Sequence, residues 1–187
     1  YGKTWKLITN GIDKLHFTRT MRADRRRAGL LYAGTEYGMY ISYDDGANWR
    51  KFQQNLPIVP ITDLTIKDND LIVATQGRAF WIIDDLTIVQ QYDPSLTNKN
   101  LHVFPVKPTW RIPGPDERFA AFQRTPVNAG ANPTSGVVIN YFLKDVTDST
   151  KATIVIKNKK KKVIKTFATE GKENKFEIVK GMNQFSW

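Results

Sequence analysis

Two adjacent aspartates, Asp44 and Asp45, are the residues of this 187-residue chain whose type and spacing come nearest to a catalytic or metal-binding pair. They lie in the stretch "SYDDGANW" at 42–49. Glycoside hydrolysis requires two carboxyl groups, about 5 to 9.5 Å apart, that face one substrate, but neighbours in an extended segment point to opposite sides. A calcium loop of EF-hand type requires a glutamate at its twelfth position, which is Asn55 when counted from Asp44. The pattern therefore disfavours both kinds of chemistry.

The same stretch fits a structural turn between two strands. Asp44 can accept backbone N–H groups across its own turn, and Ser42 can add another hydrogen bond. Gly46 can adopt a positive φ without steric cost, and Trp49 can bury its ring between sheets. We therefore predict that Ser42, Asp44, Gly46 and Trp49 are structural residues.

Residues for a binding face come from other turns of the same region. The ligand-face candidates are Glu36, Tyr37, Gln76 and Arg78. Glu36 is the best single acid, but the sequence shows no partner for it. The competing interpretation of these residues is an exposed pair of loops.

Composition excludes several classes of chemistry. The chain has no cysteine, and its two histidines, His16 and His102, lie in strand-like runs, so a histidine-rich zinc site is not expected. No Gly-x-Ser-x-Gly, phosphate-binding loop or dinucleotide fingerprint occurs. No apolar run approaches the length of a membrane-spanning helix. We expect no catalytic residue, no metal and no cofactor in this chain.

The net charge of +10 gathers in two clusters, "MRADRRR" at 21–27 and "KNKKKKVIK" at 157–165. Both are predicted to be solvated hairpin tips. The alternative is a polyanion binder that uses Arg25–Arg27 and Lys159–Lys162. No aromatic residues interleave with either cluster, so nucleic acid is not the expected partner.

An internal repeat organises the first half. The segments 30–49 and 70–89 align at an offset of 40 without a gap, which places Leu31 on Leu71 and Thr35 on Thr75. A period near 40 with about four strands is typical of a β-propeller blade. The predicted strands are 15–22, 29–35, 38–43 and 49–54 in the first unit, and 61–67, 71–76, 79–84 and 87–92 in the second.

These residues carry a family resemblance. "SYDDGANW" resembles the Asp-box, or BNR, repeat of sialidase-like and sortilin-like propellers. "GKTW" at 2–5 resembles the end of another copy, and "DDLTIV" at 84–89 resembles a degenerate copy with Leu86 in place of glycine. The wider stretch 30–86 is similar to the final blades of large secreted bacterial proteins, many from Bacteroidetes, that are labelled BNR-repeat glycosyl hydrolases or sortilin-domain proteins.

The resemblance implies an all-β chain that begins inside one blade of a larger propeller. Residues 1–100 would hold the last two blades plus one strand of a preceding blade. A sialidase-like activity would require an arginine triad and a tyrosine–glutamate pair. Arg19, Arg22 and Arg78 are available for such a triad, but no spacing ties them together.

The second half has a different pattern. Residues 101–133 are rich in proline and glycine and are predicted to be an ordered linker with a strand at 101–106 and an interdomain contact through Trp110. Residues 134–187 show short alternating strands, with a hairpin whose tip is 158–161 and a strand pair around Gly181. They resemble an immunoglobulin- or fibronectin-like sandwich that is truncated here.

Two functions from different classes follow. The first is a secreted, periplasmic or outer-membrane-associated scaffold whose propeller face binds protein, peptide or glycan, with other blades of the full-length chain as further partners. The second is a glycoside hydrolase, as the family label implies, with its carboxylates on blades outside this sequence. We prefer the binding function, because each motif residue has a structural role and the catalytic set is missing.

Overall fold

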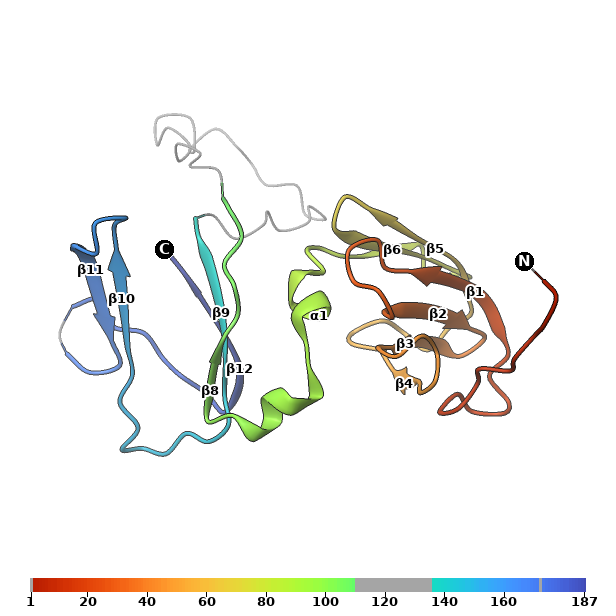
Figure 1. Cartoon of the computed structure of the whole chain (residues 1–187), viewed down its shortest axis with the longest axis horizontal. Coiled ribbons are helices and arrows are strands. Elements are labelled where there is room, and N and C mark those ends of the chain that lie inside the picture. Colours follow the sequence, from red (N-terminus) through yellow and green to blue (C-terminus); the bar gives the residue numbers. More distant parts are fainter. Residues whose placement is uncertain (1, 110–135, 172) are drawn as a thin grey trace. The chain divides into compact units, whose positions relative to one another are not determined.

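The computed structural model (Figure 1) describes residues 2–109, 136–171 and 173–187. The chain forms two compact units, Tyr1–Tyr92 and Asp93–Trp187. In both units the regular structure is almost entirely antiparallel strands, which confirms the all-β prediction. No helix of the described residues is long and apolar enough to cross a membrane.

The first sheet of unit 1 is a four-stranded meander, with neighbouring strands adjacent in the chain. Its two central strands, which carry tyrosine, threonine and isoleucine, are almost fully buried, whereas its two outer strands are largely exposed. The four strands are β1 (Thr18–Ala23), β2 (Leu31–Thr35), β3 (Gly38–Ser42) and β4 (Arg50–Lys51). The predicted order is confirmed, although β1 begins three residues later than predicted, because a turn closed by Asp13 precedes it.

The second sheet has three strands rather than the predicted four. The strands are β5 (Ile61–Lys67), β6 (Asp70–Thr75) and β7 (Phe80–Ile83). The predicted fourth strand at 87–92 is wrong, because Thr87–Gln91 form the short helix α1. In the first sheet Gly46 turns the chain toward β4 with a φ of 83°, whereas Leu86 adopts a φ of −66° and starts a helical turn.

The gap-free repeat alignment is also wrong beyond β6. Leu31 pairs with Ser42 in the first sheet, whereas Leu71 pairs with Ile83 in the second. The offset is therefore 40 from β2 to β6 and 41 from β3 to β7. One extra residue lies in the β6–β7 turn, where Ala79 adopts a positive φ of 58°. The residue of the second sheet that is structurally equivalent to Met39 is therefore Phe80.

The two sheets share details that the sequence alignment did not show. β1 carries a register shift between Thr18 and Thr20, opposite Thr35 and Gly34. β5 carries the same shift between Ile61 and Asp63, opposite Thr75 and Ala74. In each following turn a threonine hydroxyl donates to a backbone carbonyl: Thr35 to Gly38 at 2.8 Å, and Thr75 to Ala79 at 2.6 Å. The repeat is therefore structural as well as sequential.

The core of unit 1 lies between these sheets. Its first-sheet members include Tyr32, Met39 and Ile41, and its second-sheet members include Ile61, Leu64, Ile66, Leu71 and Val73. Gly34 faces Ile61 so closely that an added Cβ would lie 2.5 Å from the isoleucine Cγ2 atom. The absence of a side chain at position 34 allows the sheets to approach.

The described residues of unit 2 form two sheets. The first has the order β12-β9-β8, and the second is the hairpin β10–β11. The strands are β8 (Leu101–Val103), β9 (Val138–Leu143), β10 (Thr153–Lys157), β11 (Val163–Ala168) and β12 (Gly181–Ser186), preceded by the 3-10 helix η1 (Pro94–Asn98). The predicted strand at 101–106 is confirmed only for Leu101–Val103, and the predicted hairpin is confirmed. Trp110 and most of the predicted linker lie outside the described residues.

The predicted strand pair around Gly181 is wrong. Only β12 forms there, and it pairs with β9. The reason is Asn183, whose side chain bonds the backbone N–H of Val179 at 2.8 Å and its carbonyl at 2.7 Å. This local loop occupies the backbone groups that a strand before Gly181 would need.

Candidate functional site

The turn at 42–49 is held by its own side chains. The Ser42 hydroxyl donates to Asp44 Oδ1 at 2.8 Å and accepts the Gly46 N–H at 2.9 Å. Asp44 also accepts the backbone N–H of Asn48 at 2.8 Å and its side-chain amide at 2.7 Å. The Trp49 indole N–H donates to the Ile8 carbonyl at 2.7 Å.

These contacts direct the Asp44 carboxylate inward to its own turn. Hydrogen bonds from the Asn48 side chain, the Asn48 backbone and the Ser42 hydroxyl hold the pKa of Asp44 below its ordinary value. A carboxylate that is stabilised as an anion and surrounded by donors is a poor general acid. Trp49 is buried against Ala33 and Tyr40 under the segment that contains Ile12. The turn therefore fixes the N-terminal segment to the sheet.

Glu36 has a partner that sequence reasoning missed. The Arg19 guanidinium binds its carboxylate through two nitrogens, with Arg19 Nη2 3.1 Å from Glu36 Oε1 and Nε on the other oxygen. Arg19 lies at the bulge of β1, which pairs beside Thr35. A hairpin register would have placed the two residues together. The Arg19 guanidinium occupies both oxygens of the Glu36 carboxylate, which does not favour the proton-donor role of a glycosidase acid.

Tyr37 belongs to an aromatic cluster at the same end of the sheet. Its ring stacks on His16 with centroids 4.7 Å apart, and His16 Nδ1 lies 2.9 Å from the Tyr40 hydroxyl. Tyr37 is exposed, as is the neighbouring Phe17, whereas Tyr40 is buried. Contrary to the prediction, His16 precedes β1 rather than lying in a strand. The cluster forms a supported aromatic surface at the β2–β3 turn.

Gln76 and Arg78 lie in the β6–β7 turn, and both are exposed. The Gln76 N–H donates to the Pro60 carbonyl at 2.9 Å, and the Arg78 carbonyl accepts the Trp81 indole N–H at 2.8 Å. Among the described residues, neither side chain forms a hydrogen bond, ion pair or ring contact with Glu36 or Tyr37. The structure therefore shows the four candidates as two separate turns, each with a fixed backbone.

The arginine cluster at 21–27 is less solvated than predicted. Asp24 is buried and accepts the backbone N–H groups of Arg26 and Arg27, the Tyr32 hydroxyl and the Gln90 amide. Burial opposes its charge, but these hydrogen bonds outweigh burial and lower its pKa. The Arg27 guanidinium donates to the carbonyls of Gln90 and Tyr92. The cluster thus fastens α1 to the β1–β2 turn.

Arg27 also covers an aromatic ring. Its guanidinium carbon lies 4.7 Å from the centre of the Tyr43 ring, and burial raises the pKa of Tyr43 to about 12. These contacts join residues 24–27 to residues 90–92, which lie far apart in the chain. Local sequence patterns therefore gave no signal for them.

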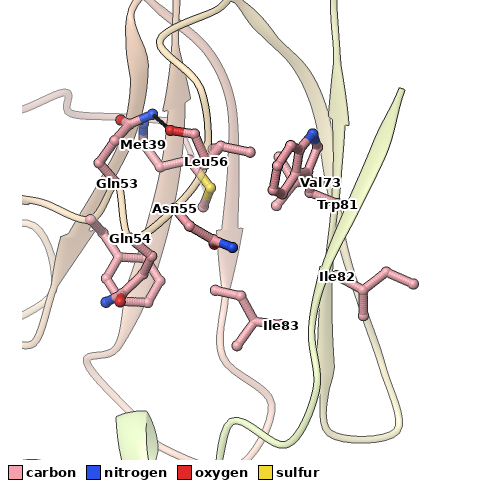
Figure 2. A pocket seen from close by; sticks show the side chains of 10 residues that line it. Met39, Gln53, Gln54, Asn55, Leu56, Val73, Trp81, Ile82 and Ile83 are labelled. Carbon is pink, nitrogen blue, oxygen red and sulfur yellow. Dashed lines mark hydrogen bonds between the residues drawn. The ribbon is translucent and has the colours of Figure 1, made fainter. Parts of the chain in front are cut away.

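Figure 2 shows a pocket between the two sheets of unit 1. Met39, Leu56, Val73, Trp81 and Ile83 are among the residues that line it. Its cavity volume is about 30 Å³, which is room for about one water molecule. Ligand pockets are about ten times larger or more, so this pocket is a packing gap.

Among the described residues, no three histidine, aspartate or glutamate side chains gather where they could hold a metal ion. Comparisons with protein-family models, with curated proteins and with solved structures found no match to this chain.

Proposed function

We propose that unit 1 is a pair of consecutive Asp-box propeller blades in a secreted or cell-envelope protein, and that their turns bind a protein, a peptide or a glycan. The observation that carries this proposal is the match between the two sheets. Both have the same strand order, the same register shift in the first strand and the same threonine bond in the following turn. Repeated sheets stacked face to face are the building principle of propellers.

The direction of stacking supports the same proposal. Met39 and Ile41 of β3 lie under the second sheet and are 2% and 4% exposed. Their equivalents on β7, Phe80 and Ile82, are 75% and 56% exposed. In Figure 2 the side chain of Ile82 points away from Trp81 and Ile83, which face the first sheet. The outer face of the second sheet is therefore equivalent to the face of the first sheet that the second sheet covers. A further sheet of the same kind could pack on this outer face in the same way.

The binding face assigned to this scaffold is the end that carries the β2–β3 and β6–β7 turns. The sheets meet there, since Gly34 contacts Ile61, and Ile61 pairs with Thr75. Exposed Tyr37 and Arg78 supply an aromatic ring and a cation, and Glu36 and Gln76 supply acceptors. Few polar groups beside a fixed aromatic surface suit glycans and peptide side chains.

The test is binding of labelled protein to a glycan array and to a peptide array. We expect selective signals that are lost in the variant Tyr37→Ala/Arg78→Ala. The matched control is Lys67→Ala/Asp68→Ala, an exposed pair in the β5–β6 turn at the opposite end of the sheet, which keeps the signals. Equal loss in both variants, or no selective signal from the wild-type protein, contradicts the assigned face.

A further inference from the structure

The hairpin of β10 and β11 concentrates positive charge in unit 2. Seven lysines occur between 151 and 165, and no acidic residue occurs from 149 to 169. Lys157 and Lys159–Lys162 are all exposed at the tip. Lys151 and Lys180 of the same unit pair with Glu170 and Asp145, but within the described parts of the chain no ion pair involves the tip lysines.

The tip is an ordered turn. The Asn158 N–H donates to the Lys162 carbonyl at 2.9 Å, and the Asn158 side chain accepts the Lys162 N–H at 3.0 Å. Lys161 adopts a positive φ of 61°, which closes the turn. The lysines therefore project from a defined scaffold, and no carboxylate of the described residues forms an ion pair that would relieve their repulsion.

Exposed apolar side chains lie beside this charge. Val155 and Val163 lie on the outer face of the hairpin, and Ile164 lies at its register shift. The inner face is occupied by Phe167, whose ring packs on Phe185 with centroids 4.8 Å apart. The core of unit 2 therefore uses one face of the hairpin and leaves a basic, apolar face exposed.

We propose that this lysine hairpin, residues 153–168, docks on the surface of an anionic lipid bilayer. Lysines act as point charges toward a diffuse anionic surface, whereas specific phosphate recognition favours the bidentate geometry of arginine, which the hairpin lacks. Its outer face has no exposed aromatic ring on which a nucleic acid base could stack. Valine and isoleucine beside lysine suit the boundary between headgroups and acyl chains.

The experiment is sedimentation of the whole chain with vesicles of phosphatidylcholine and phosphatidylglycerol, and with vesicles of phosphatidylcholine alone. We expect binding to the anionic vesicles only, weakened by added salt. Lys159→Gln/Lys160→Gln/Lys161→Gln/Lys162→Gln lowers the partition coefficient about tenfold or more. Val163→Ser/Ile164→Ser lowers it less and leaves the salt dependence intact.

The control is a variant of equal net charge, Lys3→Gln/Lys6→Gln/Lys14→Gln/Lys51→Gln, since both quadruple variants fall from +10 to +6. It retains most of the binding if the hairpin is the docking surface. Equal loss in both variants, binding to pure phosphatidylcholine, or tighter binding to a single-stranded oligonucleotide than to anionic vesicles overturns the proposal. Circular dichroism of each variant shows that the strands are retained.

Discussion

The two sheets of unit 1 share one framework and differ in how each ends. The first sheet closes through Gly46 and the hydrogen-bonded Asp44 into β4, whereas the second passes through Leu86 into α1. The register shift in the first strand is the same in both sheets, the β6–β7 turn is one residue longer than the β2–β3 turn, and the chain path differs after the third strand. Three antiparallel strands thus define the repeat. The fourth element differs, because the chain continues through Gly46 into β4 in the first sheet and through Leu86 into α1 in the second.

The largest difference is expected between equivalent residues on the covered and uncovered faces. Met39→Ala removes a buried side chain between the sheets and lowers the free energy of unfolding by about 2–5 kcal/mol. Phe80→Ala removes an exposed side chain and changes it by about 0.5 kcal/mol or less. Urea denaturation followed by tryptophan fluorescence measures both. Similar costs for the two variants contradict the assignment of a covered face at Met39 and an uncovered face at Phe80.

A smaller effect is expected where the sheets approach. The Cβ of Gly34→Ala lies 2.5 Å from Ile61 Cγ2 and 2.9 Å from Thr20 Cγ2, so overpacking costs about 1–3 kcal/mol of unfolding free energy. The matched variant Ala74→Val enlarges the equivalent residue on the outer face and costs less. The difference between the urea midpoints of the two variants measures this effect. A smaller loss of stability in Gly34→Ala than in Ala74→Val contradicts the prediction.

The turn that distinguishes the sheets gives a third test. Gly46→Ala places a side chain at a φ of 83° and 2.7 Å from Ile8 Cδ1, which costs about 1–2 kcal/mol. Gly77→Ala introduces strain at a φ of 84° but meets no atom within 4 Å, so it costs less. Thermal unfolding ranks the two. Equal melting temperatures indicate that the turn at 42–49 does not hold the N-terminal segment.

The smallest effect is expected on the pH dependence of stability at acidic pH. The folded-state pKa of Asp44 lies below its ordinary value of 3.8, so its contribution is present above that value and is lost as the pH falls through the folded pKa. Asp24 behaves in the same direction. The slope of stability against pH below 4 is therefore shallower in Asp44→Asn than in the wild-type protein. Unchanged slopes in a pH series of urea melts are the contrary result.

Local patterns predicted what depends on local chemistry. Alternating β-branched and aromatic residues located β2, β3, β5 and β6, and the Ser42–Trp49 spacing located a turn between two strands. The β10–β11 hairpin followed from its alternation around a polar tip. These features arise within a few residues of chain, so a sequence window contains their cause.

Features that depend on distant contacts were not predictable in this way. The helix at 87–91 is fixed by Gln90 and Arg27, residues that lie far apart in the chain. The extra residue before Phe80 shifts the register of β7 by one, but the aligned sequences remain similar and do not reveal it. The Arg19–Glu36 pair required knowledge of the β1 bulge. In each case tertiary contacts decided between local alternatives.

The most direct test of the two-blade proposal is an experimental structure of the protein isolated from its native source. Repeated stacking predicts that Phe80 and Ile82 lie beneath the first strand of another antiparallel sheet, as Met39 and Ile41 lie beneath the second sheet here. A structure in which these two side chains face solvent, or pack on an element other than a sheet, contradicts the proposal.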